Sequence, residues 1–160
     1  MHAEEIAKAV GHIPSGLFVI TSNDGEVSNG YLASWVQQVS FNPLVVAFAI
    51  SETRPGYEQI KSGKPFSINV VGDHNMNYLR HFWKGYDSSS NPFSSGEINH
   101  RVLESGAPVL DDAKSSIECE FMSSNKPGDH EIVFARVLNS HVHNEESTPK
   151  VHIRKSGLDY

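Results

Sequence analysis

The stretch from Gly30 to Ser51 constrains the fold of this chain more than any other part of its sequence. Its second half, Leu44–Ile50, is an unbroken apolar run without a charge, which is typical of a buried β-strand. Its first half carries small and polar side chains in a strand-like pattern, and Asn42-Pro43 divides the two halves. A buried strand beside a polar one with little side-chain bulk predicts a backbone surface on which a flat ligand lies.

The polar half, Leu32–Ser40, has a second interpretation as a solvated edge strand. Exposed strands usually carry Lys, Glu or Thr, whereas this segment has short side chains and lies one turn before the most apolar strand. A flat, hydrogen-bonding ring system would suit those short side chains and open backbone groups. Trp35 could stack on such a ring, although a tryptophan more often belongs to a core or an interface.

The rest of the chain is mostly of strand type. Strands are expected at residues 17–21, 66–71, 115–122, 132–142 and 150–154, with turn residues at 23–25 that favour a hairpin. Short helices are expected at 3–11, 55–62 and 75–83, and residues 84–97 form a surface loop that is a lid, an interface arm or a plain connector. We therefore expect a mainly β fold, an antiparallel barrel or sandwich with two or three short helices, in a single domain over residues 1–160.

The composition restricts the classes of molecule that the protein is expected to bind and the compartment in which it is expected to occur. Thirteen Lys and Arg against nineteen Asp and Glu give a net charge of −6, which argues against broad nucleic-acid or acidic-membrane binding. The single cysteine, Cys119, cannot form an intramolecular disulfide, which suits a reducing compartment. No apolar stretch approaches the ~20 residues of a membrane span, and the first residues lack the apolar core of a signal peptide. We therefore expect a cytoplasmic protein with no nucleic-acid or membrane partner.

The segment Ser51-Glu52-Thr53-Arg54 is the candidate anion site, because it stands just before a helix expected to begin at Pro55. Free backbone N–H groups and the helix dipole favour a phosphate at such a position. The hydroxyls of Ser51 and Thr53 and the guanidinium of Arg54 would add charge-assisted hydrogen bonds. Plain capping is the alternative, since Thr53 is also a good cap residue.

Nine histidines raise the question of a metal site. His141-Val142-His143 places two imidazoles on one face of a strand, and His152 is a third candidate ligand. No cysteine or close carboxylate pair completes the set, and Phe134 stands where an H-E-x-x-H motif beginning at His130 needs its second histidine. We therefore predict no metal site. The absence of G-x-G-x-x-G and P-loop motifs also removes the basis for a Rossmann-type nucleotide site.

His130 follows Gly128-Asp129 at the entry to an expected strand. An imidazole there could orient a substrate or protonate a reduced intermediate, because histidine titrates near neutral pH. A turn histidine exposed to water is the alternative that the spacing leaves open.

Eight segments stand out in order along nearly the whole chain. They are Ile13–Thr21, Leu32–Trp35, Ser40–Pro43, Phe66–Val70, Pro108–Ala113, Glu118-Cys119, Gly128–His130 and His152–Leu158. This ordered set, which is more specific than any one of its parts, resembles the flavin reductase-like family. The likeness is strongest to the flavin reductase modules fused to flavodiiron proteins.

The resemblance implies a split β-barrel, antiparallel and Greek-key-like, that binds FMN (or, alternatively, FAD) and is usually a homodimer. By likeness, His130 is the catalytic residue, associated with nicotinamide binding or proton supply. The residues that would contact the flavin are Leu32, Ala33, Ser34, Trp35 and Ser40 for the ring, Ser51, Glu52, Thr53 and Arg54 for the phosphate, and His81 and Phe82 nearby.

The function that this resemblance implies is NAD(P)H-dependent flavin reduction, with electrons passing to flavin or to a downstream acceptor such as a redox partner protein. In the absence of a Rossmann motif, the nicotinamide would stack directly on the flavin, and the cofactor would carry the hydride chemistry. The alternative is a non-catalytic electron-transfer module that holds FMN, or haem, on the same barrel.

Overall fold

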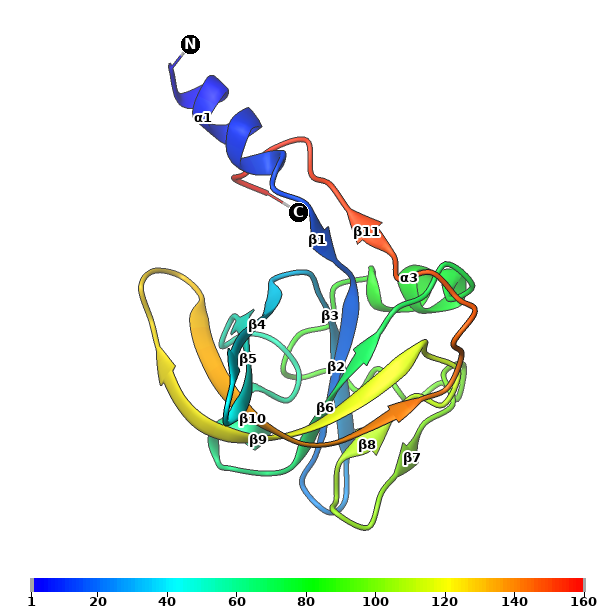
Figure 1. The fold of residues 1–160 in the computed structure, drawn as a ribbon. Helices are drawn as coiled ribbons and strands as arrows, with labels where there is room; N and C mark the ends of the chain where they lie inside the picture. The colour runs from blue at the N-terminus through cyan, green and yellow to red at the C-terminus, as the bar shows by residue number, and fades with distance from the viewer. Residues whose placement is uncertain (1, 160) are drawn as a thin grey trace.

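The computed structural model describes residues 2–159, and its body is one curled sheet of seven antiparallel strands (Figure 1). The mainly β, antiparallel fold expected from the sequence is confirmed. In the order in which they pair, the strands are β3 (Ser28–Ala33), β2 (Phe18–Asn23), β6 (Phe66–Val70), β9 (Ser115–Asn125), β10 (Glu131–Val142), β5 (Leu44–Ile50) and β4 (Val36–Phe41).

The two edge strands of this sheet, β3 and β4, are consecutive in the chain and are joined by Ser34 and Trp35. Within residues 2–159, β3 pairs with β2 alone and β4 with β5 alone, so the barrel is open at the seam between β3 and β4. The prediction of one polar strand over residues 32–40 is therefore wrong, because the segment crosses from one edge of the sheet to the other. The short side chains of Ala33 and Ser34 suit a crossing of only two residues.

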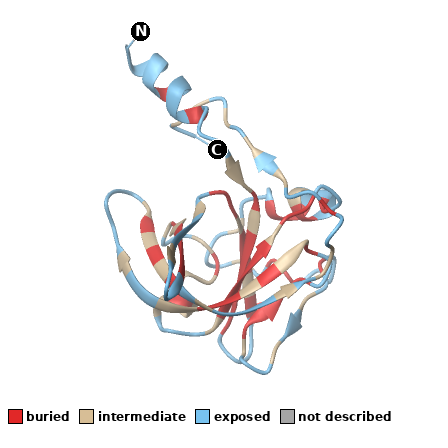
Figure 2. Ribbon diagram, in the orientation of Figure 1, coloured by how far each residue is buried: buried red, intermediate tan, exposed pale blue. Residues whose placement is uncertain are grey.

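Two buried cores lie on the two faces of β2. Ile20 faces the barrel interior, where it belongs to one cluster with Phe48 and Val133. Val19 faces the other way, into a second core that includes residues of α3 (Met76–Phe82) and of the 84–113 segment. Burial of both faces explains why β2 shows no alternation of apolar and polar residues. Figure 2 shows this concentration of buried residues in the barrel strands.

The second helix, α2 (Tyr57–Lys61), is shorter than the sequence predicted. We expected the helix to begin at Pro55, but Gly56 has a φ of 82°, a left-handed conformation that lies outside a right-handed helix. Residues 51–56 instead form turns, in which Arg54 N donates to Ser51 O at 3.0 Å. Gly63, also left-handed with a φ of 83°, follows the end of the helix.

The first helix, α1 (His2–Gly11), projects from the barrel together with the C-terminal segment (Figure 1). The two pack closely, since a Cβ added at Gly157 would lie 2.5 Å from Cβ of Val10. Below the helix, β1 (Ser15–Gly16) pairs with β11 (Val151–His152). This pairing returns the end of the chain to the open seam of the barrel. A further short pair joins β7 (Arg101–Val102) to β8 (Pro108–Val109).

Candidate active site

The open seam between β3 and β4 forms a cleft where distant segments of the chain meet. Three cavities of about 530, 150 and 10 Å³ adjoin there, and Ser34 lines all of them. Leu32, Ala33 and Arg54 line the two smaller cavities. His130 lines the smallest, together with Trp35 and Ser51. The structure therefore brings together most of the residues that the sequence singled out.

Strand register explains this convergence. Glu131, the first residue of β10, pairs with Ile50, the last residue of β5. His130 and Ser51 therefore lie next to each other, just beyond the end of the same ladder. Trp35 is fixed to β5, because its carbonyl accepts a hydrogen bond of 3.0 Å from the backbone N–H of Ala49.

Trp35 and His130 form the outer wall of the cleft. Their ring centroids are 5.0 Å apart with an edge-to-face angle of 63°, and the guanidinium of Arg154 lies 5.1 Å from the Trp35 ring. Nδ1 of His130 lies 2.9 Å from Oδ1 of Asp129, and this hydrogen bond lowers the pKa of the Asp129 carboxyl. An ionised Asp129 therefore accepts from Nδ1 and fixes the orientation of the imidazole.

Ser34 carries the clearest sign of a ligand. Its side chain is buried, with 6% of the residue exposed, and its hydroxyl has no hydrogen-bond partner within residues 2–159. A buried hydroxyl without a partner costs free energy, so native proteins rarely keep one without a reason. A flat ring with carbonyl and nitrogen atoms, such as a flavin, fits this donor and the short side chains around it.

The predicted anion site is a turn rich in hydroxyl groups. Oγ of Ser51 lies 3.0 Å from Oγ1 of Thr53 and accepts from the Thr53 backbone N–H at 3.4 Å. The helix argument for this site is wrong, because α2 begins only at Tyr57 and has a single turn or so of helix. What the segment offers an anion is therefore its hydroxyls and the half-buried guanidinium of Arg54, which lines the two smaller cavities.

Four predicted contact residues lie outside the lining of these cavities, namely Ser40, Glu52, Thr53 and His81. Ser40 is at the far end of β4, opposite Val45. The Glu52 carboxylate forms an ion pair with Nζ of Lys126 at 3.1 Å. His81 is buried, and its two ring nitrogens bind Glu97 Oε2 at 2.8 Å and the Pro92 carbonyl at 2.6 Å. His81 thus holds the 84–97 loop against α3.

Phe82, the neighbour of His81, does line the 150 Å³ cavity. The same cavity contains residues that the sequence reasoning did not assign to the site, namely Leu17, Trp83, Gly85 and His152. The ring of His152 lies 6.1 Å from that of Trp83, and burial lowers the pKa of His152. The signal that could have found His152 and Arg154 is the family-like segment His152–Leu158 near the end of the chain.

His141, near the end of β10, and His143, just after it, both contact side chains of β9. Nε2 of His141 lies 2.7 Å from the buried carboxylate of Glu118, and Nε2 of His143 lies 3.0 Å from Oγ of Ser116. Among residues 2–159, no group of three or more His, Cys, Asp and Glu side chains is arranged to hold a metal ion. Both imidazoles instead stabilise the pairing of β9 with the end of β10.

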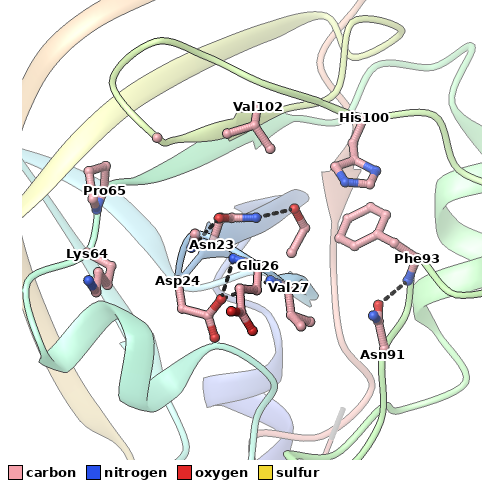
Figure 3. Close-up of a pocket in the computed structure, with 13 residues that line it drawn as sticks. Asn23, Asp24, Glu26, Val27, Lys64, Pro65, Asn91, Phe93, His100 and Val102 are labelled. Carbon is pink, nitrogen blue, oxygen red and sulfur yellow. Dashed lines mark hydrogen bonds between the residues drawn. The ribbon is translucent and has the colours of Figure 1, made fainter.

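A separate cavity of about 630 Å³ lies at the other end of the β2–β3 hairpin (Figure 3). Its polar side chains serve the hairpin turn. Asn23 donates to Ser28 Oγ at 2.8 Å, and the Asp24 carboxylate accepts from the backbone N–H groups of Glu26 and Val27 at 2.9 Å. Because these groups are engaged by the turn itself, we assign no ligand to this cavity.

Comparison with known proteins identifies the class. Residues 10–157 match the family described as "Flavin reductase like domain", and the chain therefore belongs to the flavin reductase-like family. It is 36% identical over 159 residues to putative diflavin flavoprotein A 6 of Nostoc sp., covering 99% of this chain and 28% of that protein. It is 35% identical over 157 residues to diflavin flavoprotein A 1 of Synechocystis sp., covering 98% and 27%. The chain thus spans little more than a quarter of these relatives, and its resemblance to flavodiiron modules is confirmed.

Solved structures confirm the split-barrel fold. The NADH:FAD oxidoreductase SgcE6 of Streptomyces globisporus C-1027 matches with a TM-score of 0.80 at 21% identity, covering 94% of this chain and 86% of that one. The flavin reductase PheA2 matches with a TM-score of 0.76 at 23% identity, covering 91% and 90%. These likenesses, at 21% and 23% identity, bear on the fold, whereas membership of the flavin reductase-like family rests on the match over residues 10–157. Among residues 2–159, no helix has the length and apolar character needed to cross a membrane.

Proposed function

We propose that this protein is an NAD(P)H-dependent flavin reductase that holds FMN in the cleft between β3 and β4. The observation that carries the proposal is the convergence of three features on one cleft. These are the Ser34 hydroxyl, which has no partner within residues 2–159, the hydroxyl-rich turn with Arg54, and His130 from a distant strand. The activity named for SgcE6, an NADH:FAD oxidoreductase of the same fold, supports the reaction class.

The ring of the flavin would lie against the crossing segment from Leu32 to Trp35. The outer edges of β3 and β4 face the seam, so their backbone groups are available to the ring. Ser34 Oγ would donate to a carbonyl or nitrogen of the ring and so gain the partner that it lacks among residues 2–159. Trp35, which is 38% exposed, and Phe82 would exclude water from the two sides of the ring.

The phosphate of FMN would lie at the turn of residues 51–54. Arg54 supplies a permanent positive charge with several N–H donors, and the hydroxyls of Ser51 and Thr53 supply further donors. This assignment is the first part of the proposal to test. Arg54→Ala should weaken FMN binding by roughly tenfold or more, the value of a charge-assisted hydrogen bond.

Lys126→Ala is the matched control for Arg54→Ala. It also removes a nearby cation, but Lys126 pairs with Glu52 outside the lining of the cavities. Lys126→Ala should leave FMN affinity unchanged. Equal affinities of wild type and Arg54→Ala for FMN would remove Arg54 from the phosphate site.

The nicotinamide would enter beside His130. Related structures were solved with NAD and FAD fragments and with NADP⁺, in SgcE6 and in the flavin reductase HpaC respectively. When bound, the flavin supplies a ring that accepts a hydride from the nicotinamide. His130, oriented by Asp129 at the rim of the cleft, would position the nicotinamide and hold a proton there.

His130→Ala separates this role from flavin binding. Because His130 is proposed to act on the nicotinamide, the variant should lose roughly a hundredfold in kcat/KM for NAD(P)H while its Kd for FMN stays near that of wild type. Wild-type kcat/KM in this variant would remove His130 from the reaction.

The reaction itself is tested by the visible spectrum of the purified protein and by steady-state oxidation of NADH and NADPH with added FMN or FAD. A flavin spectrum with NAD(P)H consumption well above background is the expected result. Flavin binding without consumption would instead identify an electron-transfer module. A haem spectrum would overturn the choice of cofactor.

The protein would act as a homodimer that passes electrons onward. The adjoining ends of β4 and β5 expose large apolar side chains, with Phe41 90% and Leu44 43% exposed, as at a subunit interface. The likeness to proteins named diflavin flavoproteins supports a redox partner as the downstream acceptor. Light scattering of wild type and Phe41→Glu tests the dimer, since the charge should separate the subunits.

A further inference from the structure

A buried carboxylate, Glu131, lies directly behind the proposed flavin site. Side chains along β10 alternate between its two faces. His130 belongs to the cleft, whereas Glu131, Val133 and Ala135 are buried on the barrel side. The Glu131 side chain is only 9% exposed, so its charge must be neutralised by the groups around it.

Three donors from two elements meet at this carboxylate. Tyr57 of α2 donates its phenolic hydroxyl to Oε2 at 2.5 Å, while Lys61 of α2 and Ser124 of β9 both donate to Oε1. Lys61 Nζ also donates to Ser124 Oγ at 2.7 Å. Hydrogen bonds from Lys61, Ser124 and Tyr57 lower the pKa of Glu131 to about 2, so the carboxylate is ionised near neutral pH.

Glu131 is attached to both ends of the turn that is proposed to hold the phosphate. Its backbone pairs with Ile50, the residue before the turn, and its side chain binds Tyr57, the first residue after it. Tyr57 and Lys61 are four residues apart, so they present one face of α2 to the carboxylate. A helix of this length has little stability of its own, and these contacts supply what it lacks.

From this geometry we propose that Glu131, Tyr57 and Lys61 are positioning residues that close the turn of residues 51–56 and hold Arg54 at the place of the flavin phosphate. This inference rests on the proposed function and deepens it. None of the three side chains lines the cavities of the cleft. Their effect on the ligand would pass through the turn alone, so it should be confined to the phosphate.

Titration of each protein with FMN and with riboflavin, which has the same ring without the phosphate, tests the proposal. Tyr57→Phe keeps the ring that packs against the core and removes only the tie to Glu131. It should raise the Kd for FMN by about tenfold, the loss of one charge-assisted hydrogen bond, and leave the Kd for riboflavin unchanged. Lys61→Met, which removes the other tie of α2, should act in the same direction.

Ser124→Ala is the matched control. It removes a donor from the same carboxylate, but from β9 instead of α2, and should leave both Kd values unchanged. Circular dichroism and urea unfolding show which variants are folded. If Tyr57→Phe does not fold, Lys61→Met serves as the test in its place. The proposal is overturned if the folded α2 variants bind FMN as wild type does, or if their binding of FMN and of riboflavin weakens equally. It is also overturned if Ser124→Ala changes the two Kd values as the α2 variants do. A wild type that binds neither ligand would instead refute the proposed function, and this inference with it.

Discussion

The change Ser34→Ala should have two opposite effects, since it should stabilise the flavin-free protein and weaken its binding of FMN. In the protein without flavin, the variant removes a buried hydroxyl that lacks a partner within residues 2–159. Relief of that penalty should stabilise the fold by about 1 kcal/mol, at the low end for an unsatisfied polar group. For a chain of this length, that gain corresponds to a rise in Tm of roughly 2–4 °C. The same change should weaken FMN binding by about two- to tenfold, because one neutral hydrogen bond to the ring is lost.

Thermal unfolding without flavin and fluorescence titration with FMN measure the two effects separately. Ser67→Ala is the matched control, because Ser67 Oγ is also buried and has no hydrogen-bond partner in the described part of the chain, residues 2–159. It lies within β6, outside the cleft. Ser67→Ala should also raise Tm, without changing the Kd for FMN. The reasoning fails if Ser34→Ala lowers the Tm of the flavin-free protein, or if it leaves FMN affinity at the wild-type value.

Three further outcomes follow from the structure. Glu131 has its pKa lowered from 4.5 to about 2, so its stabilising contribution is present above pH 4.5 and lost as the pH falls towards 2. Urea unfolding across that range should show a smaller loss in Glu131→Gln than in wild type. Gly56→Ala should destabilise by about 2 kcal/mol or more, because its Cβ would lie 2.2 Å from Ser22 Oγ at a φ of 82°. Gly63→Ala, with a φ of 83° and open space, should cost only about 1 kcal/mol in the same assay. Burial raises the pKa of Cys119 to about 12, so a thiol reagent at neutral pH should modify this residue only after denaturant unfolds the protein.

The strand pattern of the fold was readable from the sequence because it depends on local burial. The apolar run Leu44–Ile50 coincides with β5, which lies between β10 and β4 in the sheet. The hairpin turn at residues 23–25 was readable for the same reason, since its side chains bind their own backbone. Local patterns of this kind do not show which two strands of a barrel remain unpaired and leave it open. The crossing at Ser34 and Trp35 therefore appeared in the sequence as part of one strand.

The proposed anion site keeps the residues that the sequence singled out, although the structure contradicts the argument by which they were chosen. Pro55 suggested the start of a helix, but the left-handed Gly56 separates the turn from α2, so the helix dipole is not aimed at the cleft. In our proposal, Arg54 is held there by a contact between residues far apart in the chain, the hydrogen bond from Tyr57 to Glu131. Glu131 is also the ladder partner of Ile50 and the neighbour of His130. One residue of β10 therefore links the proposed phosphate turn to the proposed nicotinamide residue, a connection that spacing alone does not reveal.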